Sequence, residues 1–248
     1  MEPTHITVKN DVKDMKNILY EDDQIIVVFK PAGIATQTAR VGQQDMVSEL
    51  KNYLVKSQKD KSTEPYLGLI QRLDQPVSGL LVFAKTKSAA ASLSYQQSTG
   101  EIQKYYYAIV MGKPPKDRDV LVDYLYKDGR NNISLVVKED FPEAKKAALE
   151  YRKVKTLIAL EENEEATLLE IKLMTGRHHQ IRVQLAHADI PILGDGKYGN
   201  MRSKDFSKDS ACKNLALCAH KLRFKHPVTG EELTFERDPE DEIFEAFL

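Results

Sequence analysis

Asp74, a single aspartate between two apolar segments, is the residue of this sequence best placed to do chemistry. Asp74 lies in the run 68–85 (GLIQRLDQPVSGLLVFAK), with apolar residues before it and at 80–83 after it. This pattern predicts two mostly buried strands joined by a polar loop. A carboxylate beside a packed core can be partly desolvated, and Arg72 favours its ionised form. Asp74 is therefore a candidate nucleophile, although an ordinary loop ion pair with Arg72 would explain the same residues.

A second segment, 174–187 (MTGRHHQIRVQLAH), gathers basic and polar side chains. Thr175 is of a type that caps helix N-termini, and apolar residues recur after it at helical spacing: Ile181, Leu185 and Ala188. The pattern predicts a short helix over 177–187. Free N–H groups and the helix dipole favour anions at that end, so Arg177 and Arg182 would complete a site for a phosphate or a carboxylate. A solvated basic face is the alternative.

Three histidines of this segment, His178, His179 and His187, raise the question of a metal site. Adjacent residues point to different sides of a helix, and the third histidine follows eight or nine positions later. Zinc-binding helices instead carry two histidines at i and i+4. We therefore expect no metal.

Both segments resemble signatures of the RluA-type pseudouridine synthases. QRLDQPVSGLLVFAK is similar to the family's H-R-L-D-x-x-T-S-G-L-L-x-x-A-K, and TGRHHQIR with IPILGDGKYG is similar to its T-G-R-x-H-Q-I-R and P-I-x-G-D-x-x-Y-G. Three further segments match in order: KPAG at 30–33, KYYYAIVMG at 104–112 and the closing stretch 217–235. The resemblance spans about residues 20 to 237. Gln71 and Val77 depart from it where the family usually has His and Thr, which leaves details of the substrate open.

The resemblance implies isomerisation of uridine to pseudouridine in ribosomal or transfer RNA, without a cofactor. It implies Asp74 as the nucleophile and Arg182 as its ion-pair partner. Tyr106 would stack on the target base, and Arg72 would fill the space that the base leaves. Moving the base out of its stack would cost roughly a few kcal/mol. Three further residues are expected to contact the RNA: Arg177, His179 and Gln180. Attack on the sugar, attack on the ring and proton abstraction all remain open as the chemical route.

The residues alone are less specific about Tyr106. Tyr105, Tyr106 and Tyr107 stand in a strand-like run, so alternation sends the middle ring to the face opposite its neighbours. A buried structural tyrosine is as consistent with this pattern as a stacking one. The family position favours the stacking role.

Whole-chain properties agree with an intracellular enzyme. The 248 residues carry a net charge of −1 and are 42% hydrophobic, which suffices for one large domain or two small ones. Cys212 and Cys218 fit neither a disulfide framework nor a zinc site. The N-terminus lacks a signal-peptide pattern, and no apolar run approaches roughly 18 residues. We expect a cytoplasmic monomer with no membrane span.

The charge is unevenly distributed along the chain. Residues 231–248 hold eight acidic residues against Arg237 alone, which gives them −7 and leaves +6 for residues 1–230. Lysines and arginines cluster after the second motif, at 197, 202, 204, 208, 213, 221, 223 and 225. A phosphate backbone could follow this basic cluster, with a solvated surface as the alternative.

The order of apolar patterns predicts an α+β fold, a mostly antiparallel mixed sheet with flanking helices, and the family's fold is similar. Strands are expected at 24–30, 104–111, 120–126, 133–138, 147–158 and 166–174, helices at 46–55, at 87–97 and from Asp238, and a polar linker at 56–64. Residues 1–20 would form an N-terminal extension and residues 21–248 the catalytic domain. We expect no S4-type RNA-binding domain of the kind that many family members carry ahead of it.

Two other classes of function remain. A non-catalytic RNA-binding protein on the same fold would keep basic and aromatic groups but would not need Asp74. A nucleoside or glycoside hydrolase could use Asp74, but glycosidases usually need a second carboxylate. The nearest candidate, Asp195, lies in a glycine-flanked turn, which favours a structural role. An assay for both products separates the three functions: a synthase forms pseudouridine, a hydrolase releases free uracil, and a binding protein forms neither.

Overall fold

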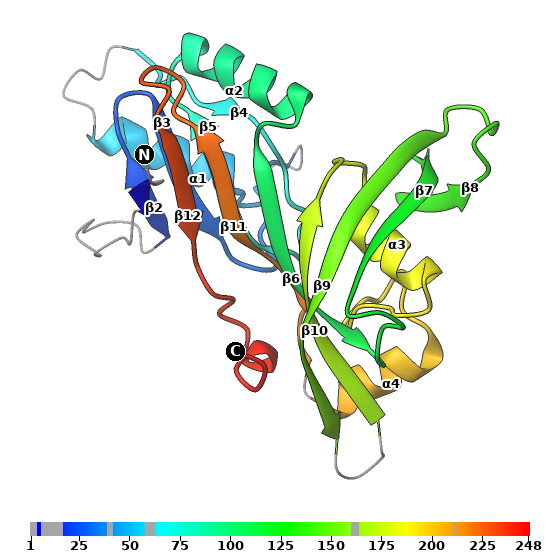
Figure 1. Ribbon diagram of the computed structural model, residues 1–248. Coiled ribbons are helices and arrows are strands. Elements are labelled where there is room, and N and C mark those ends of the chain that lie inside the picture. Colours follow the sequence, from blue (N-terminus) through cyan, green and yellow to red (C-terminus); the bar gives the residue numbers. More distant parts are fainter. Residues whose placement is uncertain (1–3, 6–16, 39–41, 58–62, 160–163, 211) are drawn as a thin grey trace. The chain divides into compact units, whose positions relative to one another are not determined.

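The structure, a computed structural model, describes residues 4–5, 17–38, 42–57, 63–159, 164–210 and 212–248. The chain divides into two compact units, whose strands and helices are labelled in Figure 1. The first unit comprises Met1–Gln103 and Ala219–Asp238, and the second comprises Lys104–Cys218 and Pro239–Leu248.

Buried apolar strands form the centre of the first unit. Its elements are β1 (Thr4–His5), β2 (Ile18–Glu21), β3 (Ile25–Lys30), α1 (Met46–Ser57), β4 (Gly68–Leu69), β5 (Ser78–Ala84), α2 (Lys87–Thr99), most of β11 (Leu217–Lys225) and β12 (Glu232–Glu236). In the order β2-β3-β5-β11, strands β3 (IIVVFK) and β5 (SGLLVFA) are buried along their whole length, as their β-branched and aromatic residues favour. A side chain at Gly79 in β5 would collide with the backbone of Ala219, so this close approach requires glycine.

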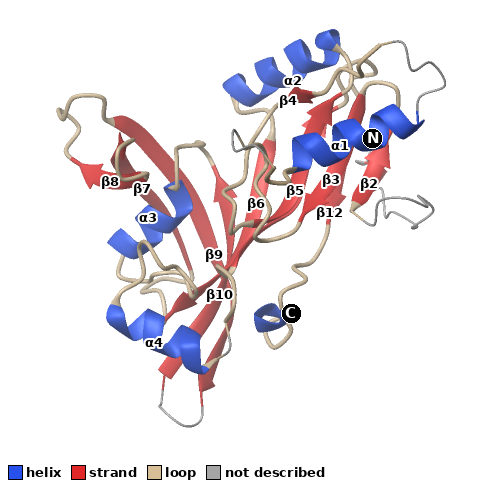
Figure 2. Cartoon of the chain, turned by 180° about the vertical axis from the view of Figure 1, so that it is seen from behind, coloured by secondary structure: helices blue, strands red, loops and turns tan. Residues whose placement is uncertain are grey.

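Two helices pack on this sheet. Helix α1 covers the face that is turned away in Figure 1 and towards the reader in Figure 2, and it buries Met46, Leu50 and Leu54. Helix α2 begins after Thr86, whose hydroxyl accepts the N–H of Ala89, and ends at Gly100 in the left-handed conformation. Helix α2 therefore begins and ends where local sequence signals place it.

The second unit is an antiparallel sheet in the order β6-β10-β9-β7-β8. Its elements are β6 (Gln103–Met111), β7 (Arg118–Asp128), β8 (Ile133–Val137), β9 (Lys145–Ala159), β10 (Glu164–Leu173), α3 (Gln180–His187) and α4 (Met201–Asp209). Helix α3 packs on one face of the sheet, where Val183 joins an apolar cluster with Leu125 and Ala147. Gln184 fastens the helix to that face, because its Nε2 donates to Asp123 Oδ2 at 2.8 Å.

The predicted α+β class is confirmed, and so are most of the expected strands. The strands expected at 104–111, 120–126, 133–138, 147–158 and 166–174 correspond to β6 to β10 within two residues. The helices expected at 46–55 and 87–97 correspond to α1 and α2. Of the expected linker at 56–64, residues 58–62 lie outside the described part of the chain. The boundary between an extension and a catalytic domain stays a prediction.

Other expectations are wrong in ways that have physical causes. Strands β1 and β2 precede the one expected at 24–30, because ILYE at 18–21 pairs antiparallel with β3. The helix expected from Asp238 is only a 3₁₀ turn, η1 (Glu242–Phe244), since Asn214 Nδ2 donates to Asp241 Oδ1 at 2.6 Å and fixes the chain just before it. No pattern predicts the polar helix α4, whose start is set by the Asn200 side chain accepting the Ser203 N–H.

None of the helices in the described residues combines the length and apolarity that a membrane-spanning helix needs.

Candidate active site

The loop that carries Asp74 joins β4 to β5 and is held from both sides. Thr36, which is buried, donates its hydroxyl to Leu73 O at 2.9 Å and accepts the Leu73 N–H at 3.1 Å. On the other side, the Gly33 N–H donates to Gln75 O at 2.9 Å, and Gln75 Nε2 returns a hydrogen bond to Gly33 O. Both neighbours of Asp74 are therefore fixed through their backbone atoms, and its position is set by the segment 33–36.

Lys30 is the centre of this arrangement. It is fully buried, and its ammonium group donates to three carbonyl oxygens, those of Pro31 (3.0 Å), Ile34 (2.7 Å) and Gln75 (3.2 Å). A buried charge is costly unless hydrogen bonds compensate it, and three carbonyl groups do so here. The KPAG turn is thereby tied directly to the residue after Asp74.

The Asp74 side chain is half-buried, and Arg72 is exposed. Arg72 forms no ion pair with any residue in the described part of the chain, so an ordinary Arg72–Asp74 ion pair does not explain the loop. The strand before the loop is short and half-buried, not mostly buried as expected, while β5 after it is fully buried. The carboxylate is thus anchored to a packed core on its C-terminal side.

The two departures from the family signature lie beside Asp74. Val77 is buried, and its N–H donates to Asp74 O at 3.0 Å, which closes the turn. Gln71 Oε1 is buried without a hydrogen-bond partner among the described residues. A buried acceptor without a donor costs free energy, so Gln71 is a locally unfavourable choice.

Arg182 and Asp195 form a buried pair within the second unit. Arg182 Nε donates to Asp195 Oδ2 at 2.8 Å and its second nitrogen donates to Oδ1 at 2.7 Å, with both side chains almost inaccessible. Asp195 Oδ1 also accepts the N–H groups of Lys197 and Tyr198 at 2.9 and 3.0 Å. Burial raises the pKa of Asp195, but the guanidinium and the two N–H groups outweigh it and hold the pKa below its ordinary value. Asp195 is therefore structural, as the sequence predicted.

The predicted N-cap is wrong, because α3 begins at Gln180 and not at residue 177. His179 occupies the N-cap in the left-handed conformation (φ 51°) and makes no side-chain cap bond. Thr175 instead accepts the N–H of Ala148 in β9 at 2.9 Å and donates to Gln180 Oε1 at 2.8 Å. A left-handed non-glycine residue at such a place is a frequent mark of a functional turn.

Gln180 is buried, and its amide is fully used inside the unit. Its Oε1 accepts the Arg177 N–H at 2.9 Å and the Thr175 hydroxyl, and its Nε2 donates to Ala148 O and to Gln184 Oε1. An amide has two donors and two acceptor positions, so none is left for RNA. This geometry favours a positioning role for Gln180, and the expected RNA contact stays a prediction.

His178 and His179 stack on one another, with ring centroids 3.7 Å apart. The Tyr198 hydroxyl accepts the Ser134 N–H at 2.7 Å, so its own proton is available for His179 Nδ1 at 2.8 Å. The Tyr198 hydroxyl therefore links His179 to Ser134 of β8. No group of three or more His, Cys, Asp or Glu side chains in the described ranges is arranged to hold a metal ion.

Tyr106 lies in β6 of the second unit and is 7% exposed. Its neighbours Tyr105 and Tyr107 are half-buried, and the predicted alternation of faces is confirmed. Its stacking role stays a prediction.

The basic cluster after the second motif is largely neutralised. Five of its eight members have acidic partners: Arg202 with Glu164, Lys208 with Asp205, Lys221 with Glu236, Arg223 with Glu232 and Lys225 with Glu101. Members 197 to 213 belong to the second unit and members 221 to 225 to the first. The alternative stated above, a solvated surface, describes these residues better than a single phosphate track, and most of their charges are paired.

Comparison with known proteins places the chain among RNA-modifying enzymes. The model of the RNA pseudouridylate synthase family matches residues 24–187. A ribosomal large subunit pseudouridine synthase D from Neisseria meningitidis serogroup A is 36% identical over 92% of this chain and 59% of the relative. A tRNA pseudouridine synthase C from Yersinia pestis is 31% identical over 89% of this chain and 85% of the relative.

The chain spans about 59 to 64% of the length of the ribosomal synthases D that it matches from Neisseria and Xanthomonas. In fold it is similar to human RNA Pseudouridylate Synthase Domain Containing 4, with a TM-score of 0.72 at 24% identity, covering 90% of this chain and 89% of that one. With the family model matching well over half of its residues, and with relatives of more than 30% identity along most of its length, the chain belongs to the RNA pseudouridylate synthase family.

Proposed function

We propose that this protein isomerises specific uridines in ribosomal or transfer RNA to pseudouridine, with Asp74 as the nucleophile. The observation that carries the proposal is the Asp74 loop, whose carboxylate is half-buried while both flanking residues are pinned by Thr36, Gly33 and Lys30. A fixed carboxylate of this kind can meet a reacting atom without first losing conformational freedom.

The reaction needs no external reactant. The bond between C1′ of the ribose and N1 of the uracil breaks, the base turns, and C5 forms a new bond to C1′. The proton on C5 is lost and N1 gains one, so the composition is unchanged. Attack on the sugar, attack on the ring and proton abstraction all require an ionised carboxylate, which is the form that Asp74 supplies in each route.

The family resemblance adds roles for residues of the second unit. Arg182 would supply the positive charge that keeps Asp74 ionised, and Tyr106 would stack on the flipped base. Arg72 is exposed, as a residue that enters the space left by the base would have to be. Arg177 and His179 are proposed RNA contacts.

A hydrolase is less well supported. Glycosidases generally use a second carboxylate, and the nearest motif candidate, Asp195, is occupied by Arg182 and two backbone N–H groups. A non-catalytic RNA-binding protein would have no use for the fixed Asp74 loop. A cytoplasmic location and a monomeric state stay predictions.

The substrate is expected to be a uridine in a compact stem-loop, because an unpaired base leaves its stack at the lowest cost. Pseudouridines in total RNA from cells with and without the gene should differ at one or a few sites, and the lost site should be modified in an isolated stem-loop. An unchanged pseudouridine map would contradict the proposed activity. A short stem-loop that stays inert while the full-length RNA is modified would contradict the proposed substrate alone.

A further inference from the structure

We infer that a pocket on the helix-covered face of the second unit binds a backbone phosphate of the RNA substrate. The cationic pocket, as we call it, has a volume of about 600 Å³. Its polar and charged lining residues are Lys127, Ser134, Glu143, Lys145, Arg177 and His178. The inference rests on the proposed function, since it takes RNA as the source of the phosphate.

Sheet geometry brings the two lysines together. Lys145 in β9 lies opposite Leu125 in β7, so both side chains lie on the same face, and Lys127 follows two residues later on that face. Leu125 belongs to the apolar cluster under α3, which identifies this as the helix-covered face. Arg177 reaches the pocket from the segment before α3, and its Nε donates to Lys146 O at 3.0 Å, which fixes the guanidinium near the lysines.

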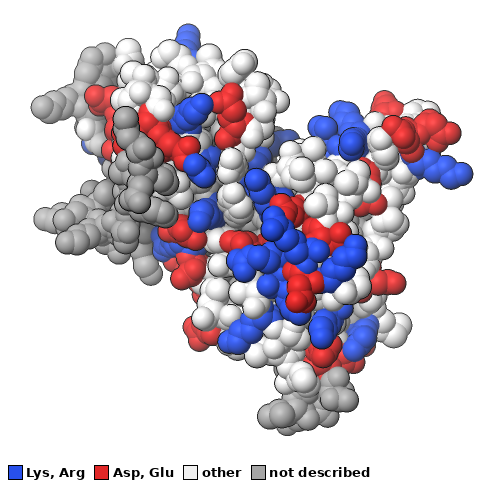
Figure 3. Space-filling view, viewed as in Figure 1, with Lys and Arg blue, Asp and Glu red and all other residues white. Residues whose placement is uncertain are grey.

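The charges of the cationic pocket are not neutralised from within the protein. Lys127, Lys145 and Arg177 form no ion pair with any residue that the structure describes, and Glu143 is the one acid among the pocket's lining residues. On the opposite face of the same sheet, Arg118 pairs with Glu150 and Arg152 with Glu170. Figure 3 shows basic and acidic side chains interspersed on the side of the molecule that it presents. Arg118 and Arg152 are thus paired with acids, whereas the three cations of the pocket are not paired within the described part of the chain.

His178 lies in the same wall, where protein groups contact both of its ring nitrogens. The Ser134 hydroxyl donates to His178 O at 2.6 Å, so it can only accept from the ring Nδ1, which lies 3.0 Å away. The ring Nε2 lies 3.1 Å from Asn132 Oδ1, another acceptor. Ser134 and Asn132 thereby fix the His178 ring in the wall of the pocket. Ser134 is in turn fixed by Tyr198, which connects the pocket to the His179 turn.

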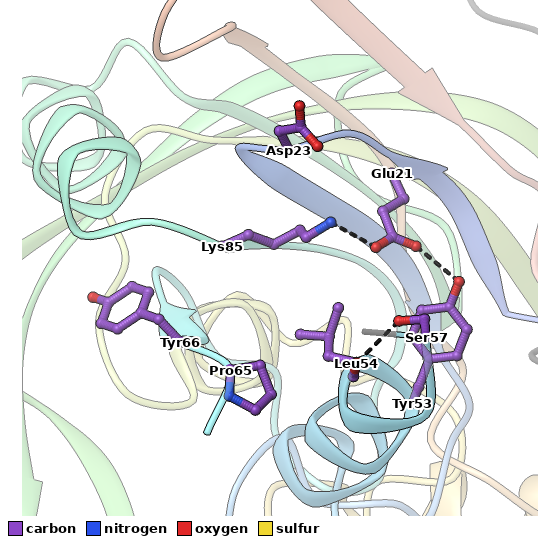
Figure 4. A pocket seen from close by; sticks show the side chains of 8 residues that line it. All are labelled: Glu21, Asp23, Tyr53, Leu54, Ser57, Pro65, Tyr66 and Lys85. Carbon is purple, nitrogen blue, oxygen red and sulfur yellow. Dashed lines mark hydrogen bonds and ion pairs between the residues drawn. The ribbon is translucent and has the colours of Figure 1, made fainter. Parts of the chain in front are cut away.

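A cavity of about 410 Å³ in the first unit provides a contrast (Figure 4). Lys85 points into it, but its Nζ lies 2.7 Å from Glu21 Oε1 and also donates to Asp22 O. Tyr53 donates to the other oxygen of Glu21 at 2.8 Å. With its cation paired and two acids, Glu21 and Asp23, in its wall, that cavity does not attract an anion.

Phosphate is the group that suits the cationic pocket. A guanidinium offers paired donors that match phosphate oxygens, and lysines add positive charge without fixed direction. Binding a phosphodiester there would release counterions and make affinity depend on salt. The flanking RNA strand would then have a fixed point on the second unit, beside the turn that carries His179.

The test compares two double variants that remove the same charge. The pocket variant, Lys127→Ala with Lys145→Ala, removes both lysines of the cationic pocket. The control, Lys116→Ala with Lys153→Ala, removes two ion-paired lysines elsewhere in the second unit. RNA affinity should fall about tenfold or more in the pocket variant and by less than about twofold in the control. In the pocket variant, the slope of log Kd against log salt should also be reduced by about one to two. KM should rise with kcat at saturating RNA unchanged. Equal behaviour of the two variants would overturn the inference.

Chemical removal of single RNA charges identifies the ligand. Methylphosphonates are placed one at a time around the modified uridine, and Kd is measured for the parent and the pocket variant. At one position the substitution should weaken the parent and have no further effect on the pocket variant. Additive losses at every position would contradict a phosphate in this pocket. A parent that binds RNA but forms no pseudouridine would refute the proposed function and leave this binding test intact.

Discussion

Asp74 and Asp195 are two aspartates in signature motifs of one family, and the structure treats them in opposite ways. Asp195 is 2% exposed, and its two oxygens accept four hydrogen bonds, two of them from Arg182. Asp74 is half-buried, and the hydrogen bonds that fix its loop go to the backbone of its neighbours. Asp195 is held by hydrogen bonds to its own carboxylate oxygens, which suits a structural role. The Asp74 loop is instead fixed through the backbone of the residues on either side of the carboxylate.

The largest effect is expected when Asp74 is changed. Asp74→Asn should abolish detectable isomerisation, because an amide is neither an anionic nucleophile nor a base. The protein should keep a cooperative unfolding transition, since the hydrogen bonds of Leu73 and Gln75 do not use the Asp74 side chain. Urea titration and single-turnover assays measure both quantities. Pseudouridine formation at the parental rate would assign the chemistry to another residue.

Breaking the pair between Arg182 and Asp195 should chiefly affect stability. Arg182→Met should lower the free energy of unfolding by about 3–5 kcal/mol, because it leaves Asp195 buried and unpaired. Activity should also be lost if Arg182 supports Asp74. Normal stability in this variant would contradict the structural role of the pair.

The same pair gives the parent protein a pH dependence. The lowered pKa of Asp195 stabilises the folded state above the ordinary carboxyl pKa of about 3.9, and this contribution is lost as the pH falls through the lowered value. Asp195→Asn should therefore show a shallower loss of stability between about pH 4 and pH 2 than the parent. Parallel curves in acid would mean that Asp195 does not titrate as described.

Lys30 tests how the Asp74 loop is held. Lys30→Met should lower the free energy of unfolding by about 2–4 kcal/mol, because three carbonyl groups lose a charged donor. Turnover at saturating RNA should fall further than the unfolded fraction explains, since Gln75 is released beside Asp74. The control is Lys204→Met at an exposed lysine, which should change neither the free energy of unfolding nor the turnover. Full turnover in the folded Lys30→Met protein would separate this lysine from catalysis.

The smallest effect is expected at Gln71. Gln71→Met keeps the shape but removes a buried oxygen that has no partner in the described residues, so the free energy of unfolding should rise by about 1 kcal/mol. Thermal unfolding of the two proteins measures the difference. A loss of stability would show that Gln71 has a favourable interaction in solution.

The sequence predicts those parts of the fold that depend on local patterns. The loop around Asp74, helix α2 and strands β6 to β10 follow from apolar spacing, turn residues and caps. The start of α3 does not, because Thr175 is taken by Ala148, a residue in a different strand. The pairing of Arg182 with Asp195 and the neutralised basic cluster also depend on long-range contacts. Of the candidate site, the residue types and the structural role of Asp195 could be predicted, but the partners that hold Asp195 could not.

The most direct measurement of the central claim follows both possible products in one reaction. A uridine-containing RNA is incubated with the purified protein, and pseudouridine and free uracil are quantified over time for the parent and for Asp74→Asn. The account predicts that pseudouridine accumulates with the parent, that free uracil does not, and that neither forms with Asp74→Asn. Release of free uracil, or pseudouridine formation by Asp74→Asn, would contradict it.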